Sequence, residues 1–123
     1  MKFQPDAMNG PSITGYGPGW VAVNGEQVTS SIVLPSNGAR FAWECASYEE
    51  LTQRHFDRLA ELDCELVVFG SGERIRFPNP AWLQALYARR IGVETMDLAA
   101  ACRTYNVLAS EGRAVLAALL IES

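Results

Sequence analysis

Three short candidate strands separated by helix-like patterns constrain the fold of this chain most strongly. They are Glu65–Phe69, Val93–Met96 and Ala114–Ile121, and the amino acids between them have the spacing of amphipathic helices. Strands that are apolar on both faces are typical of sheets covered by helices on both sides. The pattern therefore predicts an α/β domain with a largely parallel or mixed central β-sheet flanked by helices.

Three helices are expected around these strands. Ser47 and Glu50 have the spacing of a capping box at the start of the first helix, and Asn79 followed by Pro80 is typical of the start of the second, which Gly92 ends. The third helix begins at Asp97 and ends at Gly112. Its apolar side is predicted to consist of Leu98, Ala101, Cys102, Tyr105 and Ala109.

The first part of the chain is predicted to form short β-strands. Asn24-Gly25 stands between valine-rich segments and favours a hairpin that runs from Val21 to Val33, because a type I′ turn needs positive φ angles. Arg40–Cys45 is a further candidate strand. We expect a single three-layer domain over residues 1–123, with an additional N-terminal β-hairpin layer and a flexible tail over residues 1–12.

Composition excludes several classes of protein. The net charge is −4, and the arginines of the second half do not form the basic stripe of a nucleic-acid-binding protein. No apolar run reaches the roughly 18 residues of a membrane span, and the first residues resemble neither a signal peptide nor a transit peptide. The three distant cysteines, Cys45, Cys64 and Cys102, fit reduced thiols. These features favour a cytoplasmic protein without a metal site or cofactor.

The sequence Gly70-Ser71-Gly72 after an apolar strand raises the question of a phosphate-binding loop. A dinucleotide fingerprint would require a third small residue at position 75, which is Ile75, and no Gly-Lys-Ser/Thr motif follows. The next helix begins only near Pro80, so its N-terminus does not point at the loop. The loop is nevertheless a candidate binding groove, because ligands of α/β proteins bind at the carboxyl ends of strands.

Two reactive side chains are interpreted mainly as packed residues. His55 is the only histidine and lies on an apolar helix face, without the partners that a catalytic base or a zinc site requires. Cys102 lies in an apolar stripe and is expected to behave as a small hydrophobic residue; the alternative is a thiolate favoured by Arg103. Trp20, Trp43 and Trp82 are assigned to the core.

A group of polar residues near the end of the third helix allows two interpretations. In the simpler one, Gly112 ends the helix and Arg113 binds free carbonyls or pairs with Glu111. In the other, Asn106, Glu111 and Arg113 form a polar cluster with Arg74 beside the Gly70–Gly72 loop. The sequence favours the simpler interpretation.

Four segments together resemble a known domain family. They are GYGPGWVAVNG, VVFGSGERIRF, GVETMD and AACRTYNVLASEGRAVLAALL. The family is typified by mitochondrial complex I assembly factor 3 and includes the adipogenesis-associated domain protein and many uncharacterised bacterial and archaeal proteins. The resemblance extends from about Ile13 to Ile121.

Individual residues carry this resemblance. Gly70 and Gly72 match the family's Gly-Thr/Ser-Gly loop, and the second motif is matched by Asp97, Ala101, Cys102, Thr104, Asn106, Glu111, Gly112 and Arg113. The chain departs from the family at Leu98, where relatives often have threonine. The resemblance implies a three-layer α/β fold with a mixed sheet and no established catalytic activity or cofactor.

These observations lead to two hypotheses about function. The first is a non-catalytic interaction domain resembling a respiratory complex I assembly factor, with a protein partner that could be a subunit of a membrane complex. The alternative is a small-molecule-binding protein or an unrecognised enzyme. The candidate surface is the same for both and consists of Gly70, Ser71, Gly72, Arg74, Asn106, Glu111 and Arg113.

Overall fold

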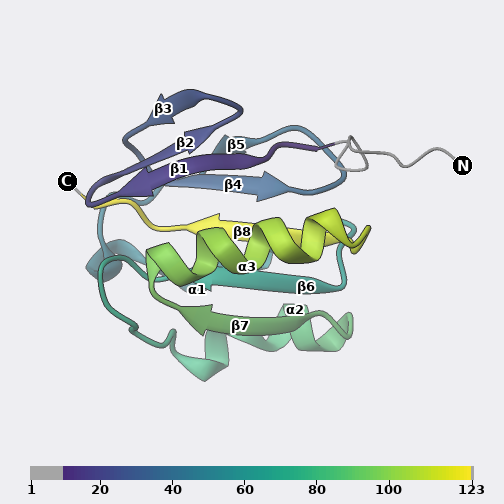
Figure 1. Cartoon of the computed structure of the whole chain (residues 1–123). Helices are drawn as coiled ribbons and strands as arrows, with labels where there is room; N and C mark the ends of the chain where they lie inside the picture. The colour runs from purple at the N-terminus through teal and green to yellow at the C-terminus, as the bar shows by residue number, and fades with distance from the viewer. Residues whose placement is uncertain (1–9, 123) are drawn as a thin grey trace, which may run out of the picture.

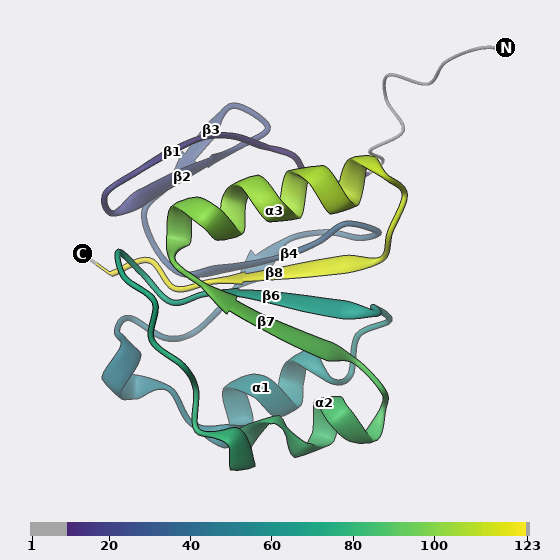
Figure 2. The same ribbon diagram turned by 60° about the horizontal axis from the view of Figure 1, so that its bottom comes forward.

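The computed structural model describes residues 10–122, which form three layers (Figures 1 and 2). A five-stranded sheet is the middle layer. Helix α3 (Leu98–Ser110) and a three-stranded sheet lie side by side over one face, and two shorter helices, α1 (Gln53–Leu59) and α2 (Gln84–Ala88), cover the other. Each face has its own cluster of buried apolar side chains. The predicted mixed α/β architecture with an added β layer is confirmed.

The central sheet has the order β5-β4-β8-β6-β7. Its strands are β4 (Ile32–Pro35), β5 (Phe41–Ala42), β6 (Leu66–Gly70), β7 (Gly92–Met96) and β8 (Val115–Leu119). Strand β6 pairs in parallel with both β7 and β8, whereas β4 is antiparallel to β8 and β5. The three segments that were predicted as strands thus lie next to one another. β6 and β8 are almost wholly buried, as expected for strands covered on both faces.

The hairpin prediction is right at its turn and wrong about its second strand. β1 (Ile13–Gly17), β2 (Trp20–Val23) and β3 (Glu26–Val28) form the separate three-stranded sheet. Asn24 and Gly25 have φ angles of 50° and 85°, as a type I′ turn requires. However, the chain leaves this sheet after Val28, and the following residues enter the central sheet as β4. The four residues of β4 are all buried, so they need cover on both faces, which an outer hairpin does not provide.

The predicted strand over residues 40–45 is shorter in the structure, and the first helix starts later than predicted. Only the two residues of β5 pair with β4, because the Trp43 and Cys45 side chains turn into the core. The Ser47 side chain caps nothing, and residues 48–50 form one 3-10 turn, η1 (Tyr48–Glu50). The capping box of α1 consists instead of Thr52 and His55, whose Nδ1 accepts the Thr52 N–H at 3.0 Å.

The second and third helices follow their sequence signals more closely. Asn79 accepts the Ala81 N–H at the start of the 3-10 segment η2 (Pro80–Leu83), which continues into α2. Gly92 does not end this helix: Arg90 has the positive φ angle, 62°, and Gly92 is already the first residue of β7. α3 buries the five predicted side chains and ends before Gly112, whose φ angle is 82°.

Two further expectations concern segments of the chain. A flexible tail was expected over residues 1–12, of which residues 1–9 lie outside the described residues. Pro11 and Ser12 are hydrogen-bonded to the fold: the Pro11 carbonyl accepts from the Tyr105 hydroxyl, and the Ser12 N–H donates to the Asn24 side chain. Within residues 10–122, no helix has both the length and the apolar character needed to cross a membrane.

Candidate functional site

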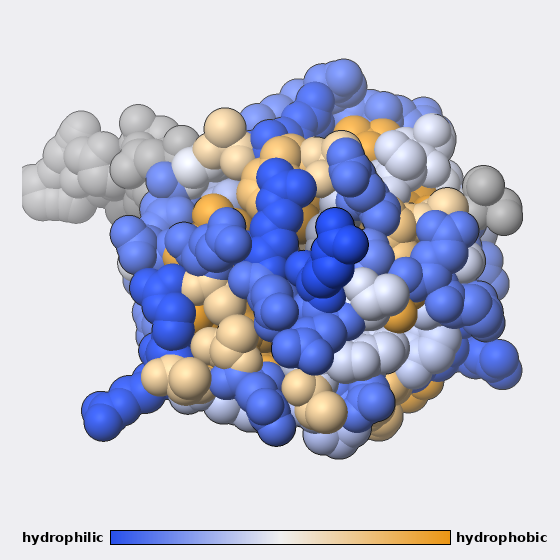
Figure 3. All heavy atoms as spheres, turned by 180° about the vertical axis from the view of Figure 1, so that it is seen from behind, coloured by the Kyte–Doolittle hydropathy of each residue, from blue (hydrophilic) through white to orange (hydrophobic). Residues whose placement is uncertain are grey.

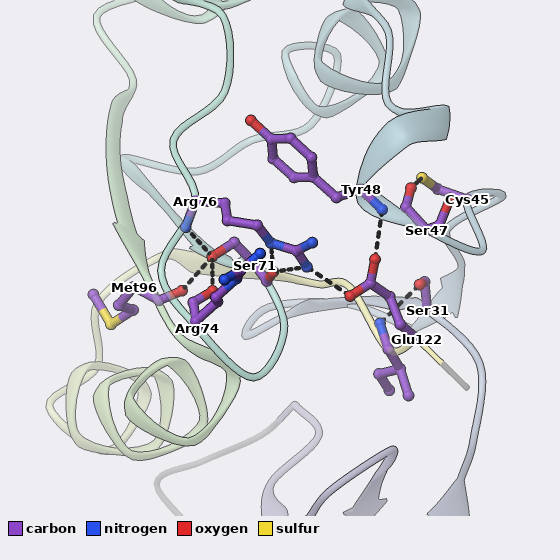
Figure 4. A network of polar contacts seen from close by, with 10 residues as sticks. Ser31, Cys45, Ser47, Tyr48, Ser71, Arg74, Arg76, Met96 and Glu122 are labelled. Carbon is purple, nitrogen blue, oxygen red and sulfur yellow. Dashed lines mark hydrogen bonds and ion pairs between the residues drawn. The ribbon is translucent and has the colours of Figure 1, made fainter.

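A buried polar network holds the loop that follows β6 (Figure 4). Ser71 is fully buried at its centre. Its hydroxyl accepts the Arg76 N–H at 2.7 Å and lies 2.9 Å from the Arg74 carbonyl and 3.3 Å from the Met96 carbonyl. The Ser71 N–H donates to the same Met96 carbonyl at 2.9 Å. Because a buried hydroxyl needs partners, these contacts fix the path of the loop beside the end of β7.

The Arg76 side chain closes this network from the solvent side. Its guanidinium donates twice to the Ser71 carbonyl, at 2.5 and 3.1 Å, and once to Glu122 Oε1 at 2.6 Å. It also lies over the Tyr48 ring, 4.7 Å from the centroid. A planar guanidinium suits this arrangement because it can stack on a ring and donate several hydrogen bonds at once. Arg76 therefore ties the loop to η1 and to the C-terminal segment.

Glu122 is the acidic partner in the network. Its second carboxylate oxygen, Oε2, accepts the Tyr48 N–H at 2.7 Å. Partial burial alone would raise the pKa of Glu122, but the hydrogen bonds from Arg76 and Tyr48 outweigh it and hold that pKa below its ordinary value. The carboxylate is thus stabilised in its charged form, as expected of a structural ion pair.

Both glycines of the loop have a steric reason to be glycine. A Cβ on Gly70 would lie 2.9 Å from the Ala101 Cβ, so this residue allows α3 to pack closely on β6. Gly72 has a φ angle of 105°, and a Cβ there would lie 2.6 Å from Arg76 Nη2 and 3.1 Å from Glu122 Oε1. Gly72 is therefore required both for its backbone conformation and for the space that the ion pair occupies.

The outer side of the same loop is apolar. Ile75 is 50% exposed and Phe77 66% exposed, and the Phe77 carbonyl accepts a hydrogen bond from the Tyr48 hydroxyl at 2.5 Å. We call these two side chains the loop surface. They alternate along the chain with Arg74 and Arg76. Because Arg76 points inward to Ser71 and Glu122, the Ile75 and Phe77 side chains on either side of it face the solvent. The sequence reasoning missed them, although this alternation beyond the end of a strand could have indicated them.

A hollow of about 590 Å³ lies at the foot of the loop. Its walls include Gly72, Arg74 and Arg76 of the loop, together with Leu98 and Glu122. Two of its polar lining side chains, Arg76 and Glu122, pair with each other at 2.6 Å, and Glu73 and Arg74 line it as well. The geometry therefore provides a loop that the Arg76–Glu122 pair holds in place beside the hollow.

The other predicted site residues do not join this loop. The Leu98 N–H bonds to the Gly72 carbonyl at the start of α3, and Glu111 follows thirteen residues later, about 20 Å further along the helix axis. Arg113 pairs at 3.2 Å with Glu65, which precedes β6 at the opposite end of the sheet, and not with Glu111. The structure brings Gly70, Ser71, Gly72 and Arg74 together and leaves Glu111 and Arg113 apart from them.

Asn106 has a structural role that the sequence did not reveal. Its Oδ1 accepts the Ile13 N–H at 3.0 Å, and its Nδ2 donates to the Ile13 carbonyl at 2.7 Å. The side-chain amide thus pairs with the edge of β1 as a neighbouring strand would. This contact joins α3 to the three-stranded sheet across 93 residues of sequence.

His55 and Cys102 are held within the fold. The His55 ring contacts the edge of Trp43 and lies 2.8 Å from the Glu44 carbonyl through Nε2, so both of its nitrogens have backbone partners. Cys102 is fully buried, and burial raises the pKa of its thiol to about 12. It is therefore a packed neutral thiol, in agreement with the main interpretation and not with the thiolate alternative.

The face opposite α3 carries a second hollow, of about 610 Å³, lined by Trp43 and by polar residues of α1 and the segments beside it. Figure 3 shows hydrophobic residues on this face as separate small areas between hydrophilic ones.

Among the described residues, no three side chains of the types His, Cys, Asp and Glu lie close enough together to hold a metal ion.

Comparison with known proteins identifies relatives over almost the whole domain. A family described as a protein of unknown function (DUF498/DUF598) matches residues 13–120. The chain is 35% identical over 111 residues to NADH dehydrogenase (ubiquinone) 1 alpha subcomplex assembly factor 3 of Bos taurus. This alignment covers 88% of the chain and 59% of the relative, so the chain spans about three-fifths of that protein's length.

Solved structures share the fold at similar levels of identity. A Bordetella parapertussis protein known from a crystal structure has a TM-score of 0.85 and 34% identity, covering 91% of this chain and 96% of that one. A Bordetella pertussis protein described as an Mth938-like domain has a TM-score of 0.80 and 29% identity, covering 100% and 94%.

Proposed function

The chain belongs to the DUF498/DUF598 family, and we propose that it assists the assembly of a respiratory NADH dehydrogenase through direct contacts with a protein partner. Its homology to a protein named as an assembly factor of that enzyme supports this role. We propose the cytoplasm as its place of action and a subunit or assembly intermediate of the membrane complex as its partner. In this role it would bind, not catalyse.

One observation carries the proposal: a polar network fixes a loop whose apolar side chains face water. The Arg76 guanidinium donates hydrogen bonds to the Ser71 carbonyl and to Glu122, whereas Ile75 and Phe77 have half or more of their area exposed. Fixing a loop in advance lowers the entropy lost on binding, and exposed aromatic anchors contribute strongly to protein interfaces. The geometry thus supports a docking role for the loop surface.

The small-molecule or enzymatic alternative has less support. It required Asn106, Glu111 and Arg113 to stand beside the glycine loop, but Asn106 binds Ile13 and Arg113 binds Glu65. The proposed functional region is the loop that carries Ile75 and Phe77. It keeps four of the predicted residues, which hold that loop surface in place: Gly70, Ser71, Gly72 and Arg74.

Complementation in cells that lack the endogenous protein tests this function. The variant carries Ile75→Ser and Phe77→Ser, and Val107→Ser is the matched control, because Val107 is 55% exposed on α3. Assembled NADH dehydrogenase is measured on native gels and by NADH oxidation in membranes, with protein level and circular dichroism checked for each variant.

We expect the wild type and Val107→Ser to restore the assembled complex, and the double variant to accumulate as a folded protein without restoring it. Normal assembly in cells without the protein would contradict the assembly role itself. Full restoration by the double variant would contradict the loop surface as the place of contact.

A further inference from the structure

Strand β7 is an edge of the central sheet with free backbone groups. Within residues 10–122 it pairs with β6 alone, in parallel. The Gly92 N–H donates to the Glu65 carbonyl, and the Met96 carbonyl accepts from the Ser71 N–H, so residues 92 and 96 turn their backbone groups toward β6. Because the backbone N–H and C=O groups of successive residues in a strand point to opposite sides, those of Val93 and Thr95 point away from β6 and from the sheet.

The outward groups of β7 lack the cover found elsewhere in the molecule. At the edge of β1, the Asn106 side chain occupies both backbone groups of Ile13. No side-chain hydrogen bond within residues 10–122 reaches the backbone of Val93 or Thr95 in this way. The other edge of the central sheet, β5, is only two residues long. β7 thus offers two donors and two acceptors in the arrangement that an added strand requires.

The side chain at the middle of this edge indicates what the added strand should carry. Glu94 is exposed and forms no ion pair with any residue of the described chain. If a second copy paired with β7 antiparallel over its full length, Glu94 would lie opposite the same residue of that copy. Like charges directly opposite each other destabilise a strand pair, whereas a lysine or arginine at this position would stabilise it. The net charge of −4 also favours a basic partner.

We propose that β7 accepts an extended segment of a partner protein as a sixth strand, and that Glu94 selects a segment with a lysine or arginine opposite it. The main-chain groups of Val93 and Thr95 provide binding, and the carboxylate provides specificity. This surface is distinct from the loop surface, so Ile75 and Phe77 are not needed for it.

Titration of the isotopically labelled full chain with two synthetic peptides tests the proposal. One contains the sequence Thr-Val-Lys-Val-Thr and the other has glutamate in place of lysine. At low salt, the lysine peptide is expected to shift the amide signals of Val93 and Thr95 and to slow their exchange about tenfold or more at saturation, because pairing withdraws them from water. The glutamate peptide is expected to bind about threefold more weakly.

Variants separate this edge from unspecific attraction. Glu94→Lys is expected to reverse the preference between the peptides, and Glu111→Lys, which makes the same charge change at the end of α3, is expected to preserve it. Thr95→Pro is expected to abolish binding, because it removes an outward N–H that the fold does not use.

Four results would overturn the proposal. The first is the absence of any amide signal change up to about 2 mM peptide, a concentration that covers millimolar affinities. The second is a set of signal changes centred outside β7, and the third is a Glu94→Lys variant that still prefers the lysine peptide. The fourth is a dimer in sedimentation whose Val93 and Thr95 amides are protected without peptide, because a second copy would then be the occupant.

Discussion

Replacing Gly72 by alanine tests the polar network most sharply, because the structure gives two separate costs. A non-glycine residue at a φ angle of 105° carries backbone strain of about 1–3 kcal/mol. The new Cβ would also lie 2.6 Å from Arg76 Nη2, so the guanidinium must move and weaken its hydrogen bonds to Ser71 and Glu122. A hydrogen bond to a charged group contributes about 1.5–3 kcal/mol. We therefore expect Gly72→Ala to lower the free energy of unfolding by about 3–4 kcal/mol.

Gly112→Ala is the matched control. Gly112 also has a positive φ angle, 82°, but a Cβ there would meet no atom of residues 10–122 within 4 Å, so the backbone cost of about 1–2 kcal/mol is what remains. Urea unfolding measures both variants, with an unchanged m-value showing that the unfolding transition is comparable. Hydrogen exchange of the Arg76 amide, which donates to the Ser71 hydroxyl, is expected to accelerate only in Gly72→Ala. Losses that agree within about 0.5 kcal/mol would refute the idea that the network constrains this loop.

Three further predictions concern buried or partly buried groups. Because the pKa of Glu122 is lowered in the folded state, its contribution to stability is present above its unfolded pKa and is lost as pH falls through its folded pKa. When the free energy of unfolding is measured as a function of acid pH, Glu122→Gln is expected to lack this loss. A profile identical to that of the wild type would exclude a stabilising pair between Glu122 and Arg76. Cys102→Ser is expected to lower the free energy of unfolding in urea by about 1–3 kcal/mol, because it buries a hydroxyl among apolar side chains. In the wild type, the raised pKa of the Cys102 thiol implies that it reacts with a thiol reagent at pH 8 only after unfolding. Asn106→Ala is expected to lose about 2 kcal/mol and to speed exchange of the Ile13 amide, whose acceptor it removes, and retention of slow exchange would contradict the pairing.

Local signals predicted the third helix well. Asp97 caps it, Gly112 follows it in a left-handed conformation, and the apolar spacing between them is long enough to define one face. Strands β6 and β8 could be predicted equally well, because a segment buried on both faces is apolar throughout. Such features depend on neighbouring residues, which is why the sequence was sufficient to predict them.

Errors arose where two local signals competed. Ser47 with Glu50 has the usual capping-box composition, yet the cap of the helix is Thr52, and His55 takes the place of the usual glutamate. Gly92 was a plausible helix end, but the turn was completed by Arg90 with a positive φ angle.

The candidate site was the least predictable part, because its contacts join distant residues. Arg76 and Glu122 are 46 residues apart, and Asn106 reaches Ile13 across 93. Nothing in the neighbouring residues of Asn106 indicates that its amide completes the edge of a strand. The glycine loop was selected from the sequence as a candidate binding groove, but the inward and outward alternation around Arg76 became evident only with the fold.

Photo-crosslinking from position 77 tests the central claim most directly. A photoreactive phenylalanine analogue replaces Phe77 in cells, and the same analogue at Val107 serves as the control, because both side chains are more than half exposed. Crosslinked proteins are identified by mass spectrometry. The proposed role predicts that position 77, but not position 107, crosslinks to a subunit or assembly intermediate of NADH dehydrogenase. Absence of such subunits from the position 77 products, or equal yields from both positions, would contradict it.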